Sequence, residues 1–386
     1  MRKAFICPTK YVQGEDELLN IGYFVKTFGE SALLIAHSDD VKRVKDKLNE
    51  TAKRFSITFH ESNFNGECSR HEVSKLQRIA KDNNCACTIG LGGGKAIDTA
   101  KCVAEGQPLI IVPTIAATDA PTSHSAVLYT EDGAFDDYAY FKQSPSVVLI
   151  DTNVIANAPT RFLVSGMGDA LSTYFEARAT AASYSNVNAG LPCGAREGLC
   201  SSAKYTNTAL ALAKLCYQTL LADGEKAKAA NECQMVTPAL ENIIEANILL
   251  SGLGFESAGL AAAHAIHDGL TALEGTHAYY HGEKVAFGTL VQLVLENAPT
   301  QEVDEVLNFC CSIGLPVCLA DIGVNSITDE ELMEVAKKSC IPEESIHSMP
   351  FPVSENSVAA AIITADHIGR AYKLRRAHNE KAYKQA

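Results

Sequence analysis

Short apolar runs alternate with longer amphipathic segments through the first 150 residues of the chain. The apolar runs predict β-strands at Ala4–Cys7, Ala32–Ala36, Ile57–Phe59, Cys87–Gly90, Leu109–Val112 and Val147–Ile150. The segments between them have apolar residues at helical spacing and predict helices at Glu15–Phe28, Val41–Arg54, Glu72–Asn83 and Lys95–Ala104. This alternation is typical of a parallel sheet with helices on both faces.

Two further segments complete the pattern. The segment from Ala126 to Phe141, with the turn Glu131-Asp132-Gly133, predicts a β-hairpin inserted between two strands. Beyond Pro159 the chain is rich in Ala and Leu and predicts helices at Arg161–Ser165, Asp169–Thr180, Cys200–Asp223, Pro238–Leu253, Ser257–Leu273, Gly282–Asn297, Val303–Ile313, Asp329–Cys340 and Ser357–Arg376. We therefore expect an α/β domain over residues 1–160, an all-α domain over residues 161–386, and a cleft between them.

Composition narrows the class of protein. The length of 386 residues suits two domains, and 47% hydrophobic with 20% charged residues is typical of a soluble globular chain without a membrane span. A net charge of −13, from 33 basic and 46 acidic residues with no basic stripe, argues against a nucleic-acid surface and favours a small-molecule partner. The 13 cysteines show no disulfide framework and no signal-peptide core is visible, so we expect reduced thiols and a cytoplasmic protein.

A glycine turn, Gly92-Gly93-Gly94-Lys95, connects the strand predicted at Cys87–Gly90 to the following helix, which includes Asp98. Glycines let backbone N–H groups approach a ligand closely, and the first turn of a helix presents free donors at its positive end. The turn therefore suits a pyrophosphate. A tight turn without a ligand would use the same residues, and the triple glycine alone does not separate the two possibilities.

Three residues whose side chains can bind a metal ion lie at predicted helix ends: Asp169, His264 and His281. One carboxylate and two imidazoles are enough for a catalytic zinc ion, because they leave a fourth position open. A histidine on an Ala-rich helix is more often an ordinary core residue, so spacing alone does not establish a metal site. His267 and Asp268 are neighbours of His264 on the same helix, and Asp268 could orient a ligand histidine or simply be solvated.

A polar loop follows the strand predicted at Leu109–Val112 and includes Thr114, Thr118, Asp119 and Ser123. Loops at the carboxyl ends of parallel strands are where open α/β sheets hold ligands. The hydroxyls and the carboxylate of this loop suit a cofactor and a polyol. The same residue types also form ordinary hydrogen-bonded turns.

Taken together, these motifs resemble the iron- or zinc-dependent polyol and alcohol dehydrogenase family, and within it the glycerol dehydrogenases. The resemblance rests on four stretches, Gly92–Asp98, Pro113–Ser123, Gly166–Leu171 and Ala261–His267, the last continuing to His281–Gly288, and covers essentially the whole chain. It implies that Asp169, His264 and His281 hold zinc and that Asp119 faces the substrate hydroxyls.

The resemblance also implies an NAD site and a reaction, the oxidation of glycerol to dihydroxyacetone, and leaves His267 as a polar residue near the metal. The released proton could go to water, to His267 or to solvent beside His264, and the sequence does not rank these routes. The residues expected at NAD are Gly92, Gly93, Gly94, Lys95, Asp98, Thr114, Thr118, Ser123, Ser125 and Tyr129. Iron-using relatives have a histidine where this chain has Thr173, which favours zinc. Relatives form homo-oligomeric rings, so an oligomer such as an octamer is expected.

Two departures and several alternatives stay open. An acidic residue often meets the adenosine ribose after the second strand, whereas this chain reads His37-Ser38-Asp39. If His37 occupies that place, either Asp39 substitutes for the acidic residue or the expected preference for NAD over NADP weakens. Ser125 replaces a usual aliphatic residue and makes the nicotinamide pocket more polar. The alternatives are a glycerol-1-phosphate or 2-hydroxy acid dehydrogenase, a sugar-phosphate cyclase of the same architecture, and a binding protein without the chemistry.

Overall fold

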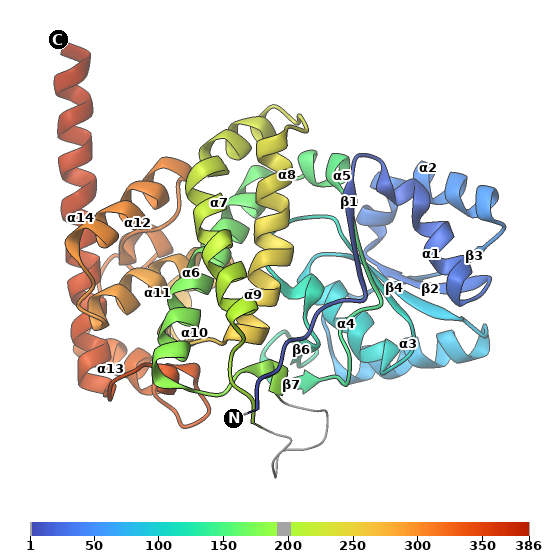
Figure 1. Ribbon diagram of the computed structural model, residues 1–386, viewed down its shortest axis with the longest axis horizontal. Coiled ribbons are helices and arrows are strands. Elements are labelled where there is room, and N and C mark those ends of the chain that lie inside the picture. Colours follow the sequence, from blue (N-terminus) through green and yellow to red (C-terminus); the bar gives the residue numbers. More distant parts are fainter. Residues whose placement is uncertain (1, 191–201, 386) are drawn as a thin grey trace.

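The computed structural model describes residues 2–190 and 202–385, and it places a parallel sheet beside a helical part (Figure 1). The strands in sheet order are β1 (Lys10–Gly14), β8 (Val147–Asp151), β5 (Leu109–Pro113), β4 (Cys87–Gly92), β2 (Ser31–Ala36) and β3 (Thr58–Asn63). Every pairing within this sheet is parallel. The strand order reverses its direction between β2 and β4, so the end of β4 lies at a switch point where such sheets bind ligands.

Helices cover both faces of the sheet, as the alternating pattern predicts. They are α1 (Ile21–Phe28), α2 (Ser38–Phe55), α3 (Arg70–Asp82) and α4 (Gly94–Ala104). Successive residues of a strand point to opposite faces. In β2, Leu33 and Ile35 accordingly join the core that includes residues of α3 and α4, whereas Leu34 joins the core under α1 and α2. Burial on both faces explains why the inner strands β2, β4, β5 and β8 read as continuous apolar runs, which the edge strands β1 and β3 do not.

The predicted hairpin is present. It consists of β6 (Ser125–Tyr129) and β7 (Phe135–Tyr140), which pair antiparallel as a separate two-stranded sheet. Ala126 and Leu128 are buried with Cys102 of α4, so the apolar face of the hairpin lies against the helix that follows the glycine turn.

The prediction of a strand at Ala4–Cys7 is wrong. The edge strand beside β8 is β1, Lys10–Gly14, which begins after Pro8. Ala4 N–H instead donates to Lys204 O, and Ile6 N–H donates to Ser257 Oγ. The N-terminal segment therefore crosses to the helical part, and the sheet begins after the proline, which has no N–H to give to a ladder.

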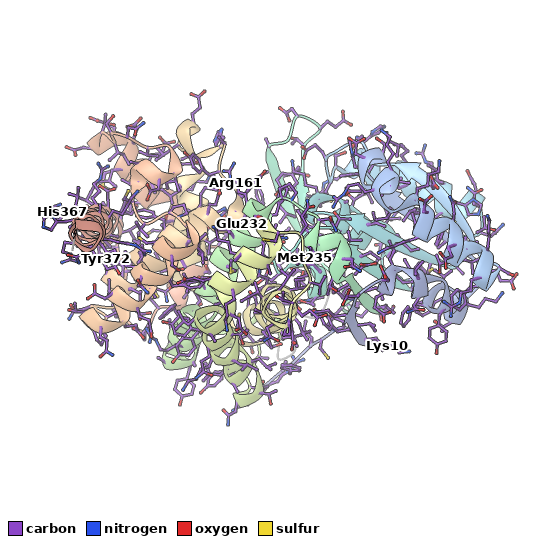
Figure 2. The ribbon with its side chains drawn as sticks, turned by 90° about the horizontal axis from the view of Figure 1, so that it is seen from above. Lys10, Arg161, Glu232, Met235, His367 and Tyr372 are labelled. Carbon is purple, nitrogen blue, oxygen red and sulfur yellow. The ribbon has the colours of Figure 1, made fainter. Side chains whose placement is uncertain are left out.

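The C-terminal half of the described chain is helical, as predicted. Its helices are α5 (Thr152–Ala156), α6 (Thr160–Ser183), α7 (Asn207–Glu232), α8 (Pro238–Glu245), α9 (Ser251–Ala258), α10 (Ala262–Leu270), α11 (His281–Leu295), α12 (Thr300–Ile313), α13 (Asp329–Ser339) and α14 (Glu355–Gln385). The expected helix start at Cys200 lies outside the described residues. Figure 2 shows α14 along its axis at the edge of the helical part, with His367 and Tyr372 on it and the sheet on the opposite side.

Among the described residues, no single helix is long and apolar enough to cross a membrane. Pro238–Ala258 and Ala262–Leu270 pass that test only as a pair, bent by 103°.

The expected break between Arg161–Ser165 and Asp169–Thr180 is absent, because α6 runs unbroken through Gly166 and Gly168. These glycines serve close packing. A Cβ on Gly166 would lie 2.0 Å from Ala116 O, and one on Gly168 would lie 2.3 Å from Gly282 O. Asp169 is therefore in the interior of a helix and not at its end, which corrects the sequence-based prediction.

Two other helix boundaries also differ from the prediction. The helix expected to end at Leu253 continues to Ala258, with a π-helical segment, η4 (Ala246–Leu250), between α8 and α9. The chain then breaks at Gly259, whose φ of 98° favours glycine, and α10 begins at Ala262. His264 consequently lies in the first turn of α10 and not within a longer helix.

Candidate metal and nucleotide site

Asp169, His264 and His281 meet at one point although they come from three helices, α6, α10 and α11. One ligand atom from each residue lies within 4.8 Å of the others. Asp169 Oδ1 is 3.3 Å from His264 Nε2 and 3.2 Å from His281 Nε2. The structure therefore brings together the three residues that the sequence analysis named as candidate metal ligands.

Asp169, His264 and His281 are together called the metal cluster below, meaning the three side chains that could hold one metal ion. Their donor atoms fit a divalent transition-metal ion. Asp169 is buried, and its Oδ1 has no hydrogen-bond partner among the described residues. A buried carboxylate oxygen without a donor is costly unless a cation satisfies it. Two imidazole nitrogens and one carboxylate oxygen are the donor types of catalytic zinc sites.

Glu176 fixes the orientation of His264. It lies two turns after Asp169 on α6 and is fully buried, and its Oε2 is 2.6 Å from His264 Nδ1. Its Oε1 accepts the backbone N–H groups of Ala261 and His264, which start α10. With the proton on Nδ1 shared with Glu176, the lone pair of Nε2 points into the metal cluster.

A second chain of contacts leads away from His281. Its Nδ1 is 3.1 Å from His267 Nε2, and His267 Nδ1 is 2.8 Å from Asp268 Oδ1. If each Nδ1 carries the proton, Asp268 accepts from His267 and His267 accepts from His281. This assignment leaves His281 Nε2 as an acceptor facing Asp169.

The charges within the cluster depend on one another. Burial raises the pKa of Asp169, but contacts with protonated His281 and His264 outweigh this effect and hold the pKa far below its ordinary value. Burial lowers the pKa of His264, but Glu176 and Asp169 outweigh this effect and raise it well above its ordinary value, so metal binding at Nε2 would release a proton. Burial and the neighbouring His281 lower the pKa of His267 to about 4. Near pH 7 the cluster thus combines an anionic carboxylate with a neutral His267.

Asp119 lies beside the metal cluster at the end of the loop that follows β5. Its backbone N–H donates to Asp169 Oδ2 at 3.4 Å, and its Oδ2 accepts from Ser251 Oγ at 2.6 Å. Burial and the charge of Asp169 raise the pKa of Asp119 well above its ordinary value. The side chain of Asp119 therefore lies next to the position where a substrate bound to the metal ion would lie.

The glycine turn opens α4 at the carboxyl end of β4. Gly92 has φ 148°, Gly93 is the N-cap of α4, and a Cβ on Gly94 would meet no atom within 4 Å. The first turn of α4 has N–H groups without an intrahelical acceptor, and Gly94 leaves open space beside it, which together suit an anion. Lys95 pairs with Glu67, and its Nζ lies 5.0 Å from the centre of the Tyr129 ring.

The other predicted nucleotide residues surround this turn without all pointing into it. Thr114 N–H donates to Gly92 O, while Thr118 is half-buried on the loop toward Asp119. Asp98 is buried, and its oxygens contact Lys101 and the N–H of Val127. Ser123 Oγ and Ser125 O both contact Lys101.

Four residues with a place at the site escaped the sequence analysis: Glu176, Lys101, Ser251 and Asp40. Glu176 lies seven positions after Asp169 and Lys101 three after Asp98, so helical spacing could have indicated both. Ser251 follows the π-helical segment, for which the sequence has no signal. Asp40 Oδ2 would be 3.4 Å from a Cβ on Gly92, whereas Asp39 is exposed and pairs with Lys42.

A glycine turn at the switch point of a parallel sheet, combined with a carboxylate and two histidines on neighbouring helices, is the arrangement expected of a metal-dependent dehydrogenase. Comparison with known proteins agrees. Residues 8–152 match the family model described as iron-containing alcohol dehydrogenase. The chain is 48% identical to a glycerol dehydrogenase of Citrobacter freundii over 97% of this chain and all of that protein.

Two further similar proteins are a curated relative and a solved structure. A glycolaldehyde reductase of Halobacterium salinarum is 42% identical over 96% of this chain and 99% of its own length. The crystal structure of glycerol dehydrogenase from Schizosaccharomyces pombe superposes with a TM-score of 0.91 at 37% identity, covering 97% of this chain and 93% of that one. The chain belongs to the iron-containing alcohol dehydrogenase family, in its glycerol dehydrogenase branch.

Proposed function

We propose that this protein oxidises glycerol to dihydroxyacetone with NAD as the hydride acceptor and a zinc ion held by Asp169, His264 and His281. The observation that carries the proposal is the convergence of these three side chains around an Asp169 oxygen without a hydrogen-bond partner. The names of the relatives support glycerol as the substrate.

The nucleotide is proposed to lie across the end of β4 with its pyrophosphate on the glycine turn. Gly93, Gly94 and the first turn of α4 would supply the N–H donors, and the loop from Thr114 to Ser125 would line the nicotinamide side. Asp40, which faces Gly92, is better placed than His37 or Asp39 to meet the adenosine ribose. A carboxylate there favours NAD over NADP.

The metal ion would lower the pKa of the substrate hydroxyl, so that the alcohol gives up its proton near neutral pH. Asp169, His264 and His281 would hold that ion in place, with Glu176 fixing the ring of His264. Asp119, held by Ser251, would orient the remaining hydroxyls of the polyol. His267 and Asp268 hold one proton between them and continue from His281, which makes His267 the proposed carrier of the released proton.

Zinc is preferred over iron in this proposal because of Thr173. Its Oγ1 is 2.8 Å from Ser251 Oγ, in the same hydrogen-bonded group as Asp119. The hydroxyl of Thr173 is therefore hydrogen-bonded to Ser251 and does not act as a fourth ligand, so the metal cluster has three protein ligands. Three ligands with an open fourth position is the usual form of a catalytic zinc site.

The alternative activities are less well supported. A phosphorylated substrate needs clustered cations, but Arg161 makes a two-bond pair with Glu283, and burial lowers the pKa of Lys284. A 2-hydroxy acid would bring a second anion toward Asp119 and Asp169. A binding protein without chemistry has no need for the Glu176 contact that orients His264.

A cytoplasmic location and a homo-oligomer, such as an octamer, belong to the same proposal. The test is a steady-state assay of nucleotide reduction with glycerol, 1,2-propanediol, 2,3-butanediol, glycerol-1-phosphate and a 2-hydroxy acid, each with NAD and NADP. The proposal requires the highest kcat/KM for glycerol with NAD. In the reverse direction, NADH oxidation is measured with the corresponding carbonyl compounds and with glycolaldehyde, the substrate named for one of the relatives. A higher value for the phosphate ester or the hydroxy acid would replace glycerol by that substrate.

A further inference from the structure

Lys101 is a buried cation that the proposed reaction does not use. It lies on α4, beyond the first turn that would meet the pyrophosphate, and its side chain is 1% exposed. Lysine is almost never buried to this extent unless its ammonium is paired and fully hydrogen-bonded.

Four oxygen atoms surround the Lys101 ammonium. Three belong to the loop and the start of the hairpin: Nζ is 2.7 Å from Ala120 O, 2.8 Å from Ser123 Oγ and 2.7 Å from Ser125 O. The fourth is Asp98 Oδ1, one turn earlier on α4, at 3.2 Å. An ammonium has three N–H donors, and its three shortest contacts are all to this segment, Ala120–Ser125.

The other side of the loop is attached to the helical part. Ser251 Oγ donates to Asp119 Oδ2, Thr122 Oγ1 donates to Ile248 O, and Asn247 Nδ2 donates to Ala116 O. Lys101 thus connects the helix that begins at the glycine turn to a loop that is also bonded to the helices beside the metal cluster.

We propose that Lys101 is a positioning residue for hydride transfer. Its ammonium fixes segment Ala120–Ser125 to α4 and thereby sets the distance between the nucleotide and Asp119 beside the metal cluster. Asp98 supplies the counter-charge to Lys101 and holds Val127 of the hairpin through the other oxygen. The inference rests on the proposed function, because it assigns a role within the same reaction.

The test compares Lys101→Met with the double variant Asp98→Asn/Lys101→Met. Methionine has a similar length and no charge, but it leaves the Asp98 carboxylate buried without a cation. The double variant removes both charges, so it is expected to melt at a higher temperature than Lys101→Met while leaving the segment detached. The matched control is Lys47→Met, which likewise leaves a buried carboxylate, Asp151, without its cation.

In both variants kcat for glycerol oxidation should fall about 100-fold, the loss that a displacement of about 1 Å can cause. The Kd of NADH, measured by fluorescence, should change much less, because the glycine turn is intact and the oxygens of Asp98 are engaged by Lys101 and the N–H of Val127. Lys47→Met should lose stability without this fall in kcat. If Lys101→Met does not fold, the double variant decides the question by the same two measurements.

Three results would overturn the inference: wild-type kcat in either folded variant, recovery of kcat together with the melting temperature in the double variant, or a loss confined to NADH affinity. A wild-type protein that reduces NAD with no alcohol of the panel would instead contradict the proposed function. The two failures are therefore distinguishable.

Discussion

Replacing Glu176 by Gln should weaken metal binding without touching a metal ligand. The amide keeps an oxygen for the N–H groups of Ala261 and His264, but its NH₂ group would face His264 Nδ1, now 2.6 Å from a carboxylate oxygen. His264 would then accept at Nδ1 and carry its proton on Nε2, which points at Asp169. The lone pair that a metal ion needs would be lost from the cluster.

The expected loss follows from the kind of contact. Removing such an orienting partner lowers metal affinity about 10- to 100-fold, which corresponds to about 1.4–2.8 kcal/mol of binding free energy. The assay is a competition titration of zinc against a chromogenic chelator, with kcat/KM for glycerol measured at saturating zinc.

A matched control exists elsewhere in the chain. Glu256 is also fully buried and contacts a histidine outside the metal cluster, His124. Its Oε1 accepts the backbone N–H of His124 and also contacts Nδ1 of the His124 ring. Glu256→Gln should leave zinc affinity at the wild-type value. Equal zinc affinities for wild type and a folded Glu176→Gln variant would mean that Glu176 does not set the protonation of the His264 ring.

Three further outcomes are expected. Gly282→Ala should destabilise the protein by about 1–3 kcal/mol or more and lower its zinc content, because the added Cβ would lie 1.8 Å from a carbonyl oxygen of α6; an unchanged melting temperature would contradict this. Burial and Asp268 raise the pKa of Glu344 to about 8, so folded protein binds more protons than unfolded protein between the ordinary value and about 8, and stability should fall as pH rises through that range. Glu344→Gln should flatten this slope in melting curves between about pH 5 and 9, and an equally steep slope would count against it. Asp40→Asn should narrow the NAD-over-NADP ratio of kcat/KM more than Asp39→Asn does, and the reverse order would exclude Asp40 as the ribose partner.

The sequence predicted the inner strands of the sheet well because β2, β4, β5 and β8 are buried on both faces. Leu33 to Ile35 contribute to both cores, and such short apolar runs alternating with helices are typical of a covered parallel sheet. The sequence-based prediction was wrong where glycines are present because of contacts between helices and not because a helix ends. Gly166 and Gly168 indicate a helix end by their propensity, but they sit inside α6 because Ala116 and Gly282 approach its backbone closely.

The three ligand candidates were predicted from the family resemblance, whereas the residues that support them were not predicted. Asp169, His264 and His281 have the side chains of metal ligands, but their spacing did not show that they meet, and the structure brings them together. Ser251 reaches Asp119 from the turn after a π-helical segment, and the four oxygens around Lys101 come from separate segments of chain. Such contacts depend on how helices and loops meet in three dimensions, which no periodicity encodes.

We propose that Asp169, His264 and His281 hold the zinc ion on which glycerol oxidation depends. This is tested by measuring zinc content and NADH formation from glycerol for wild type and His281→Ala, each stripped with a chelator and then returned to zinc. Wild type should regain one zinc ion per chain and its activity, whereas His281→Ala should regain neither although it folds. Retained zinc and unimpaired glycerol oxidation in His281→Ala would contradict it.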